Sequence, residues 1–242
     1  MYFLPHIAIL FSAAFFFTFE RIYPGRELPN SKGWYLRAIF ITISQILITF
    51  LTNKICNEWY RDYSLFNLSN LQNPLLEGFI GWLTGSFFFY WWHRIRHRNG
   101  FWHVFHQIHH SPKRIEAITS FYKHPIEILS DSLLSVFVLY YFLGSSIIGA
   151  MWFNFFAATG EFFYHSNIKT KPWMRYLIQT PELHSIHHQL DLHKYNYSDL
   201  PIWDRIFNTY KDTKTFSKQC GFPNNNEKKI GEMLIFKDVY ND

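Results

Sequence analysis

Residues 87–110 read FFFYWWHRIRHRNGFWHVFHQIHH and change abruptly from aromatic to basic and histidine-rich. The aromatic part ends an apolar run, Leu75–Trp92, in which Glu77 is the one charged residue. Aromatic clusters at the end of an apolar helix are typical of the membrane–water boundary. The stretch therefore predicts a membrane helix that ends at the interface and leads directly into a polar, histidine-rich segment.

Apolar runs on both sides of this stretch predict further membrane helices. Phe3–Phe19 and Trp34–Thr52 approach the roughly 20 residues that cross a bilayer, and no basic residue precedes the first run, which favours a retained helix over a signal peptide. Residues 132–160 carry no charge over 29 residues, too many for one crossing and too few for two. Gly144-Ser145-Ser146 favours a turn between two short or tilted helices within 126–164; a single long, tilted helix is the alternative.

Composition agrees with one membrane-embedded domain. Of 242 residues, 21% are aromatic and 17% charged, and this length suits a single domain. Cys56 and Cys220 can form neither a disulfide framework nor a zinc-ligand spacing. We expect an all-α integral membrane protein with about four to five transmembrane or re-entrant helices and a cytoplasmic histidine-rich cap.

Basic residues predict the orientation of the chain. Segments 21–37 and 93–125 contain four and six Lys and Arg, against two in 53–74. The positive-inside rule with alternating spans then places residues 20–33 and 93–125 in the cytoplasm and the N-terminus outside. A hairpin over 126–164 would return the chain to the cytoplasmic side. The net charge of +5 is spread over several loops, which favours contact with lipid headgroups and predicts no nucleic-acid partner.

The histidines form spaced groups. His93 and His97 have the i, i+4 spacing that places two rings on one helix face. The pattern His-x-x-His-His occurs twice, at 106–110 and 184–188, and on a helix its three rings project within an arc of roughly 100°. Neutral imidazole is a good ligand for iron, copper and zinc. Eight such ligands exceed one four-coordinate zinc site and predict two metal ions.

Together these boxes resemble, in order and spacing, the fatty acid hydroxylase/sterol desaturase superfamily. The likeness covers about Leu75–Tyr210 and includes Phe121–Glu127 (FYKHPIE), Asn196-Tyr197 and Trp203–Tyr210 (WDRIFNTY). It implies an iron-dependent, O₂-using integral membrane enzyme with histidines facing the cytoplasm. Ser198 and Asn208 depart from it, because relatives commonly have glycine there; Asn tolerates positive φ better than most residues.

The resemblance implies a set of metal ligands. These are His93, His97, His106, His109, His110, His184, His187 and His188, with His165 as an additional family histidine. His124 is also carried over, with the competing interpretation that it only hydrogen-bonds near the helix start at Pro125. His6, His103 and His193 are left out, the first and last as ordinary surface or interface residues.

Carboxylates near the boxes are candidates for holding the outer N–H of a metal-bound histidine. They are Glu161, one helical turn before His165, Glu182, just before the last box, and Asp204. For Asp204, pairing with Arg205 or capping of a helix is an equally good interpretation.

The expected function is O₂-dependent hydroxylation of a C–H bond in a lipid, such as an acyl chain or sterol, at a di-iron centre. Desaturation is the neighbouring possibility, because both reactions begin by removing a hydrogen atom. A haem electron-transfer protein would need isolated histidines facing each other near mid-membrane, and a metal transporter would need ionisable residues within its spans. The expected cofactors are two iron ions, replaceable by zinc on overexpression, with O₂ as co-substrate.

The expected partners are a lipid from the bilayer and a separate electron-donor protein, because His124-Pro125 lacks the Gly-Gly of a cytochrome b5-type haem signature. The C-terminus is no endoplasmic-reticulum retention signal, so a bacterial inner membrane and an internal eukaryotic membrane both fit. Oligomeric state is left open. Within one domain, 1–242, we expect N-terminal membrane helices over 1–74, a catalytic core over 75–210 and a soluble tail over 211–242.

Overall fold

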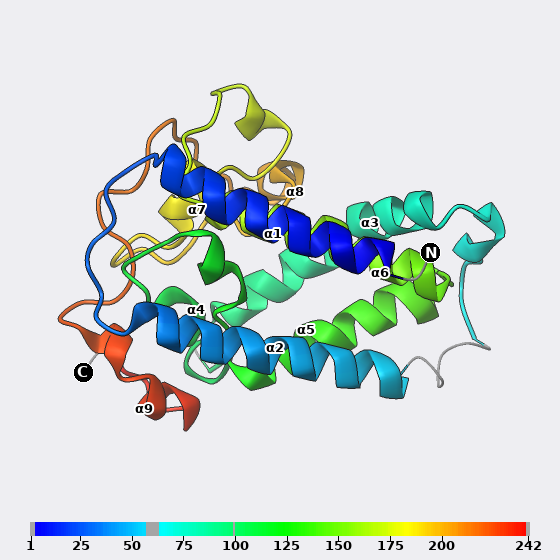
Figure 1. Ribbon diagram of the computed structural model, residues 1–242, viewed down its shortest axis with the longest axis horizontal. Coiled ribbons are helices and arrows are strands. Elements are labelled where there is room, and N and C mark those ends of the chain that lie inside the picture. The colour runs from blue at the N-terminus through cyan, green and yellow to red at the C-terminus, as the bar shows by residue number, and fades with distance from the viewer. Residues whose placement is uncertain (1–2, 57–62, 99, 241–242) are drawn as a thin grey trace.

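The structure, a computed structural model, describes residues 3–56, 63–98 and 100–240. Five long helices pack side by side, and successive ones run in alternating directions (Figure 1). They are α1 (Leu4–Ile22), α2 (Trp34–Cys56), α3 (Pro74–Arg96), α5 (Pro125–Val136, continued by the π-helical η4, Phe137–Phe142) and α6 (Ile147–His165). The described residues form only isolated β-bridges and no strand. The expected all-α fold is confirmed.

Short helices fill the connections between the long ones and the C-terminal part of the chain. They are η1 (Leu68–Leu71), η2 (Trp102–His106), α4 (Gln107–His110), η3 (Ala117–Phe121), η5 (Met174–Tyr176), α7 (Pro181–His187), α8 (Pro201–Ile206), η6 (Asn226–Lys228) and α9 (Ile230–Leu234). Except for η1, they gather at the end of the bundle where α1, α3 and α6 finish, and form a cap there (Figure 1). The histidine boxes, although separated in sequence, therefore lie at the same end.

Three helical stretches are long and apolar enough to cross a membrane: Leu4–Ile22, Trp34–Thr52 and Pro125–Phe142. On α1 and α2, large apolar side chains such as Phe11 and Leu36 are more than 70% exposed. Exposed apolar surface of this extent suits lipid and would be costly in water. The protein is thus an integral membrane protein. Leu75–Trp92 forms most of α3 but is not among the three stretches.

The pair α3 and α6 forms the inner part of the bundle. Gly81 and Gly85 of α3 face α6 so closely that a Cβ on Gly85 would lie 2.9 Å from the Phe153 ring. Small residues of this kind allow two membrane helices to approach each other. The predicted turn is present between η4 and α6, where Gly144 has φ 62° and Ser146 caps α6 by accepting from the Gly149 amide. The two-helix interpretation of 126–164 is confirmed.

Two parts of the cap contact the long helices. Residues from the tail, Phe222, Met233 and Val239, pack in one core with Trp34 and Ile41 of α2. On the other side, Trp203 of α8 donates to Ser86 Oγ of α3 at 2.8 Å, ten residues and so about 15 Å from the end of α3. Because Ile202 and Ile206 are about half exposed there, α8 presents an apolar surface beside α3.

Candidate metal centre

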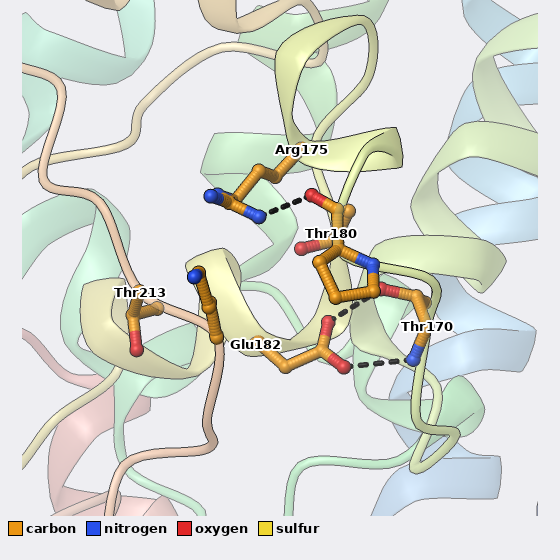
Figure 2. Close-up of a pocket in the computed structure, with 7 residues that line it drawn as sticks. Thr170, Arg175, Thr180, Glu182 and Thr213 are labelled. Atoms are coloured by element: carbon orange, nitrogen blue, oxygen red, sulfur yellow. Dashed lines mark hydrogen bonds between the residues drawn. The ribbon is translucent and has the colours of Figure 1, made fainter.

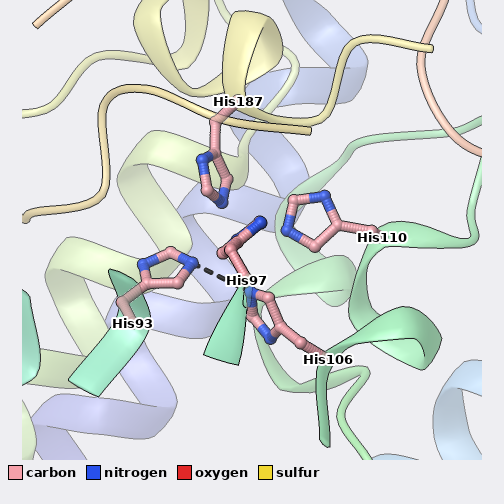
Figure 3. A group of neighbouring side chains, drawn as sticks. All are labelled: His93, His97, His106, His110 and His187. Carbon is pink, nitrogen blue, oxygen red and sulfur yellow. Dashed lines mark hydrogen bonds between the residues drawn. The ribbon is translucent and has the colours of Figure 1, made fainter. Parts of the chain in front are cut away.

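Nine histidines converge in the cap in two groups, and within each group the candidate ligand atoms all lie within 4.8 Å of one another. Site A consists of His93, His97, His106, His110 and His187 (Figure 3). Site B consists of His109, His165, His184 and His188. The structure therefore brings together all eight histidines of the three boxes and His165.

Each His-x-x-His-His box contributes to both sites. In the first box, His106 and His110 point into site A, whereas His109 points into site B. In the second, His187 belongs to site A and its two neighbours to site B. The rings of His110 and His188 stack with centroids 4.2 Å apart, so the two sites adjoin.

Alternate carbonyl groups of residues 193–197 orient three histidines of site A. His187 Nδ1 donates to the Tyr195 carbonyl and His93 Nδ1 to the Tyr197 carbonyl, each at 2.7 Å. His97 hydrogen-bonds the backbone of His193. His193, Tyr195 and Asn196 all have positive φ, between 42° and 70°. This left-handed stretch, called the carbonyl cradle below, curls the chain so that successive carbonyls face the site.

The tautomers in site A leave lone pairs directed inward. His106 Nδ1 donates to Glu127 at 2.9 Å, and His93 Nδ1 is likewise a donor, so in each neutral ring Nε2 carries the lone pair. These two Nε2 atoms are only 2.9 Å apart, an unfavourable approach unless a cation lies between them. Three more Nε2 atoms are buried without a hydrogen-bond partner: those of His97, His110 and His187. Such a donor set fits a metal ion.

Site B has the same character. His165 Nδ1 donates to the Glu161 carbonyl at 2.9 Å, which leaves Nε2 with its lone pair facing the site. That atom lies 2.9 Å from His184 Nε2 and 3.2 Å from His109 Nε2. His188 Nε2 lies 3.1 Å from His184 Nε2. Four converging imidazole nitrogens, like those of site A, also fit a metal ion.

Burial keeps these imidazoles neutral, which is the form that binds a metal. Desolvation, reinforced by neighbouring histidines, lowers the pKa of His106, His109, His110, His184 and His188 well below 6.5. Desolvation likewise lowers the pKa of His187 to about 3.

The carboxylates that contact histidines of the two sites differ in part from those predicted. Glu161 does lie beside a histidine, with its carboxylate 3.4 Å from His165 Nδ1. Glu127, which holds His106, was missed, although it belongs to the FYKHPIE motif and follows His124 by three residues. Its role could have been suspected from that motif, since an acidic residue next to a histidine motif is the usual outer partner of a metal-bound imidazole.

Glu182 does not hold a histidine. Its two carboxylate oxygens accept from the Thr170 amide and hydroxyl, each at 2.7 Å (Figure 2). It therefore ties two cap segments together. The pocket beside it, which Arg175 and Thr213 also line, is small, with room for about one water molecule.

Asp204 also makes no hydrogen bond to a histidine. Its carboxylate accepts from the amides of Tyr197 and Ser198, both at 2.9 Å, and from the Thr209 hydroxyl at 2.7 Å. Asp204 therefore acts on site A indirectly. It holds Tyr197, which belongs to the carbonyl cradle and whose carbonyl accepts from His93. Pairing with Arg205 is not observed either, since that guanidinium bonds the carbonyls of Arg175 and Tyr176.

Two histidines need correction. His124, carried over as a ligand, lies in neither site; it caps α5, with Nδ1 accepting from the Ile126 amide at 3.0 Å. The alternative interpretation was therefore the better one, because the Ile126 amide lies in the first turn of α5, where backbone N–H groups have no intrahelical partner. His193, taken as an ordinary residue, lies with Nδ1 3.1 Å from His110 Nδ1. Burial lowers the pKa of His193 to about 4.

Comparison with known proteins agrees with this arrangement. The sequence profile described as fatty acid hydroxylase matches residues 78–209, which include every residue of both sites. The chain belongs to the fatty acid hydroxylase family.

Among curated members similar to the chain are plant and animal proteins. It is 31% identical over 137 residues to very-long-chain aldehyde decarbonylase GL1-7 of Oryza sativa subsp. japonica, covering 51% of this chain and 21% of that protein. It is 28% identical over 167 residues to fatty acid hydroxylase domain-containing protein 2 of Homo sapiens, covering 66% and 47%. The chain thus matches between a fifth and a half of the length of these relatives. No solved structure matches it.

Proposed function

We propose that the protein is an oxygenase that uses O₂ to hydroxylate a C–H bond of a lipid, with one iron ion in each histidine site. The observation that carries this proposal is the convergence of nine imidazoles on two adjoining centres. In four of them, His93, His106, His165 and His187, Nδ1 donates to an acceptor outside the centres and so leaves the Nε2 lone pair facing inward. Membership of the fatty acid hydroxylase family supports iron as the metal and a lipid as the substrate.

The chain's own residues would orient the centre and keep water out. When bound, two redox-active irons would bind O₂ and supply electrons for its reduction, which oxidation of an unactivated C–H bond requires. Glu127, Glu161 and the carbonyl cradle hold the histidine rings in a fixed tautomer. Most of the nine rings are fully buried, and exclusion of water protects a reactive centre from side reactions.

A lipid substrate would reach the centre from the side. His93 lies in the last turn of α3, directly after Trp91 and Trp92, so site A begins where the aromatic interface ends. The apolar surface of α8 lies beside the same helix. We further propose that the cap faces the cytoplasm, as the basic residues indicate, and that a separate protein delivers electrons there.

Two other reactions of the same centre are candidates. Several curated relatives are named very-long-chain aldehyde decarbonylases, which favours a long-chain aldehyde as a second candidate substrate. Desaturation is the third, because it differs from hydroxylation only after the first hydrogen atom has been removed.

One experiment separates these reactions. Cells with and without the protein are grown under ¹⁸O₂, and their lipid extracts are compared by mass spectrometry. Hydroxylation predicts a new lipid that carries ¹⁸O, whereas desaturation predicts loss of two hydrogens and decarbonylation a product one carbon shorter. The His188→Ala variant should abolish the new product, and His124→Ala, which changes a histidine outside both sites, should keep it. Purified protein without bound metal, or with a haem absorption band, would refute the proposal.

A further inference from the structure

Buried ion pairs connect the outer sides of the two sites at the junction of α3, α5 and α6. Glu127, which accepts from His106 of site A, pairs with Arg96. Glu161, beside His165 of site B, pairs with Lys123 at 3.0 Å. Asp131 joins the two halves, because its carboxylate lies 3.3 Å from Arg96 and 3.6 Å from Lys123.

This ion-pair path runs through seven side chains: His106, Glu127, Arg96, Asp131, Lys123, Glu161 and His165. Its five charged members are poorly accessible, from 0% exposed for Glu127 to 21% for Glu161. Charges in such surroundings interact more strongly than pairs on the surface. A displacement of one side chain toward a neighbour therefore changes the electrostatic interaction of that neighbour with the next side chain in the path.

Metal binding at the two sites would add positive charge beside both ends of this path. All nine candidate ligands are neutral imidazoles, so two divalent ions would bring four positive charges with no anionic ligand from either histidine group. The carboxylates in direct contact with ligand rings are Glu127 and Glu161. Glu127 contacts both His106 and Arg96. Glu161 contacts both His165 and Lys123. The two basic side chains, Arg96 and Lys123, both contact Asp131.

We propose that Asp131 is a positioning residue that transmits the charge of Lys123, beside site B, to the ligands of site A through this path. The proposal rests on the proposed function, since site A must hold metal. If Lys123 loses its charge, Asp131 becomes free to draw Arg96 away from Glu127. Glu127 then accepts a stronger hydrogen bond from His106 Nδ1, which makes His106 Nε2 a better metal ligand, and site A binds metal more tightly. Lys123 itself contacts no residue of site A in any described hydrogen bond or ion pair.

The test measures Co²⁺ affinity at site A alone. Site B is disabled by His184→Ala and His188→Ala, and Co²⁺ is titrated into the purified protein while the visible absorption of the bound ion is followed. In this background Lys123→Gln, which keeps a hydrogen-bond donor near Glu161 but removes the charge, should tighten site A by about fivefold, the lower range of measured couplings between sites. Adding Asp131→Asn should reduce the effect of Lys123→Gln to less than about twofold, as a double-mutant cycle requires for a path through Asp131.

Controls separate the path from general effects. Lys123→Arg keeps the charge and should leave the Co²⁺ affinity of site A unchanged. Asp212→Asn breaks the Arg175–Asp212 pair of the cap, 2.7 Å in length, and should also leave it unchanged. Size-exclusion profiles in detergent show whether each variant is folded, and Lys123→Met replaces Lys123→Gln should the latter aggregate.

The outcomes distinguish this inference from the function on which it rests. If wild-type protein binds Co²⁺ at both sites but Lys123→Gln leaves site A unchanged, the coupling is wrong and the proposed function stands. An equal shift with and without Asp131→Asn would also overturn it, because the effect would then act directly through space. Wild-type protein that binds no Co²⁺ would overturn both.

Discussion

His109 and His110 are adjacent in the chain, yet their ring planes are 86° apart and the two side chains belong to different sites. His109 faces His165 of site B, with 3.2 Å between the Nε2 atoms. The ring of His110 lies 4.6 Å from that of His187 in site A. Neighbouring residues thus link the two centres through a single short helix, α4.

This division predicts different losses from two adjacent substitutions. His109→Ala should lower the metal content of site B and His110→Ala that of site A, each reducing the bound metal from about two ions per chain toward one. Elemental analysis gives the total, and Co²⁺ absorption spectra of the two variants should differ, because different ligand sets remain. Identical spectra would speak against two separate sites.

We predict that His193 contributes to metal binding, although the sequence alone marked it as an ordinary surface or interface residue. Its ring contacts His110, and its backbone hydrogen-bonds His97. We expect His193→Ala to weaken metal binding by about tenfold, the size seen when an outer partner of a ligand is removed. Competition with a chelator measures this affinity. His103→Ala, which changes a histidine outside both sites, is the matched control; an equal loss in both variants would contradict the assignment.

Asp204 predicts a pH dependence of stability. Desolvation raises its pKa from 3.8 to about 6 in the folded protein. The folded state therefore binds the proton more tightly than the unfolded state, so this contribution to stability is complete below about pH 3.8 and is lost as the pH rises through about 6. The melting temperature of the wild type, relative to Asp204→Asn, should rise when the pH is lowered from 7.5 to 5. A constant difference would show that Asp204 does not titrate in this range.

The close packing of α3 against η4 predicts a position-specific effect of small substitutions. A Cβ on Gly81 would lie 2.9 Å from Leu139, whereas a Cβ on Gly160 meets nothing closer than 3.9 Å. Gly81→Ala should destabilise the protein by about 1–3 kcal/mol, as over-packing of a filled interior does. Gly160→Ala should leave the melting temperature in detergent unchanged or raise it. If both variants melted alike, the close approach of the helices would be in doubt.

Much of the fold could be predicted from local sequence. Apolar runs fixed by the thickness of a bilayer marked α1, α2 and most of α3, and Gly144-Ser145-Ser146 marked the turn between η4 and α6. The hydropathy of these runs does not say which helices are central. That depends on glycines such as Gly81 and Gly85, whose importance appears only when the helix they face is known.

The outer partners of the histidines were predicted less well. Glu161 was found because it precedes His165 by one helical turn, a relationship within one helix. Glu127 reaches His106 from another helix, and the carbonyl of Tyr197 reaches His93 across 104 residues of sequence. No local spacing reports such contacts, and carbonyl groups, which every residue has, leave no mark in the sequence at all.

By itself, the sequence determined which side chains could form a metal centre and that they would lie at the end of membrane helices, because both follow from periodicity and hydropathy along a single segment. Only the tertiary structure decided how the histidines divide between two sites, which of them have lone pairs directed inward, and that His124 lies apart from both. These properties depend on the angles at which separate helices meet. They also depend on backbone conformations such as the positive φ of Tyr195 and Asn196, which are held by contacts from distant parts of the chain.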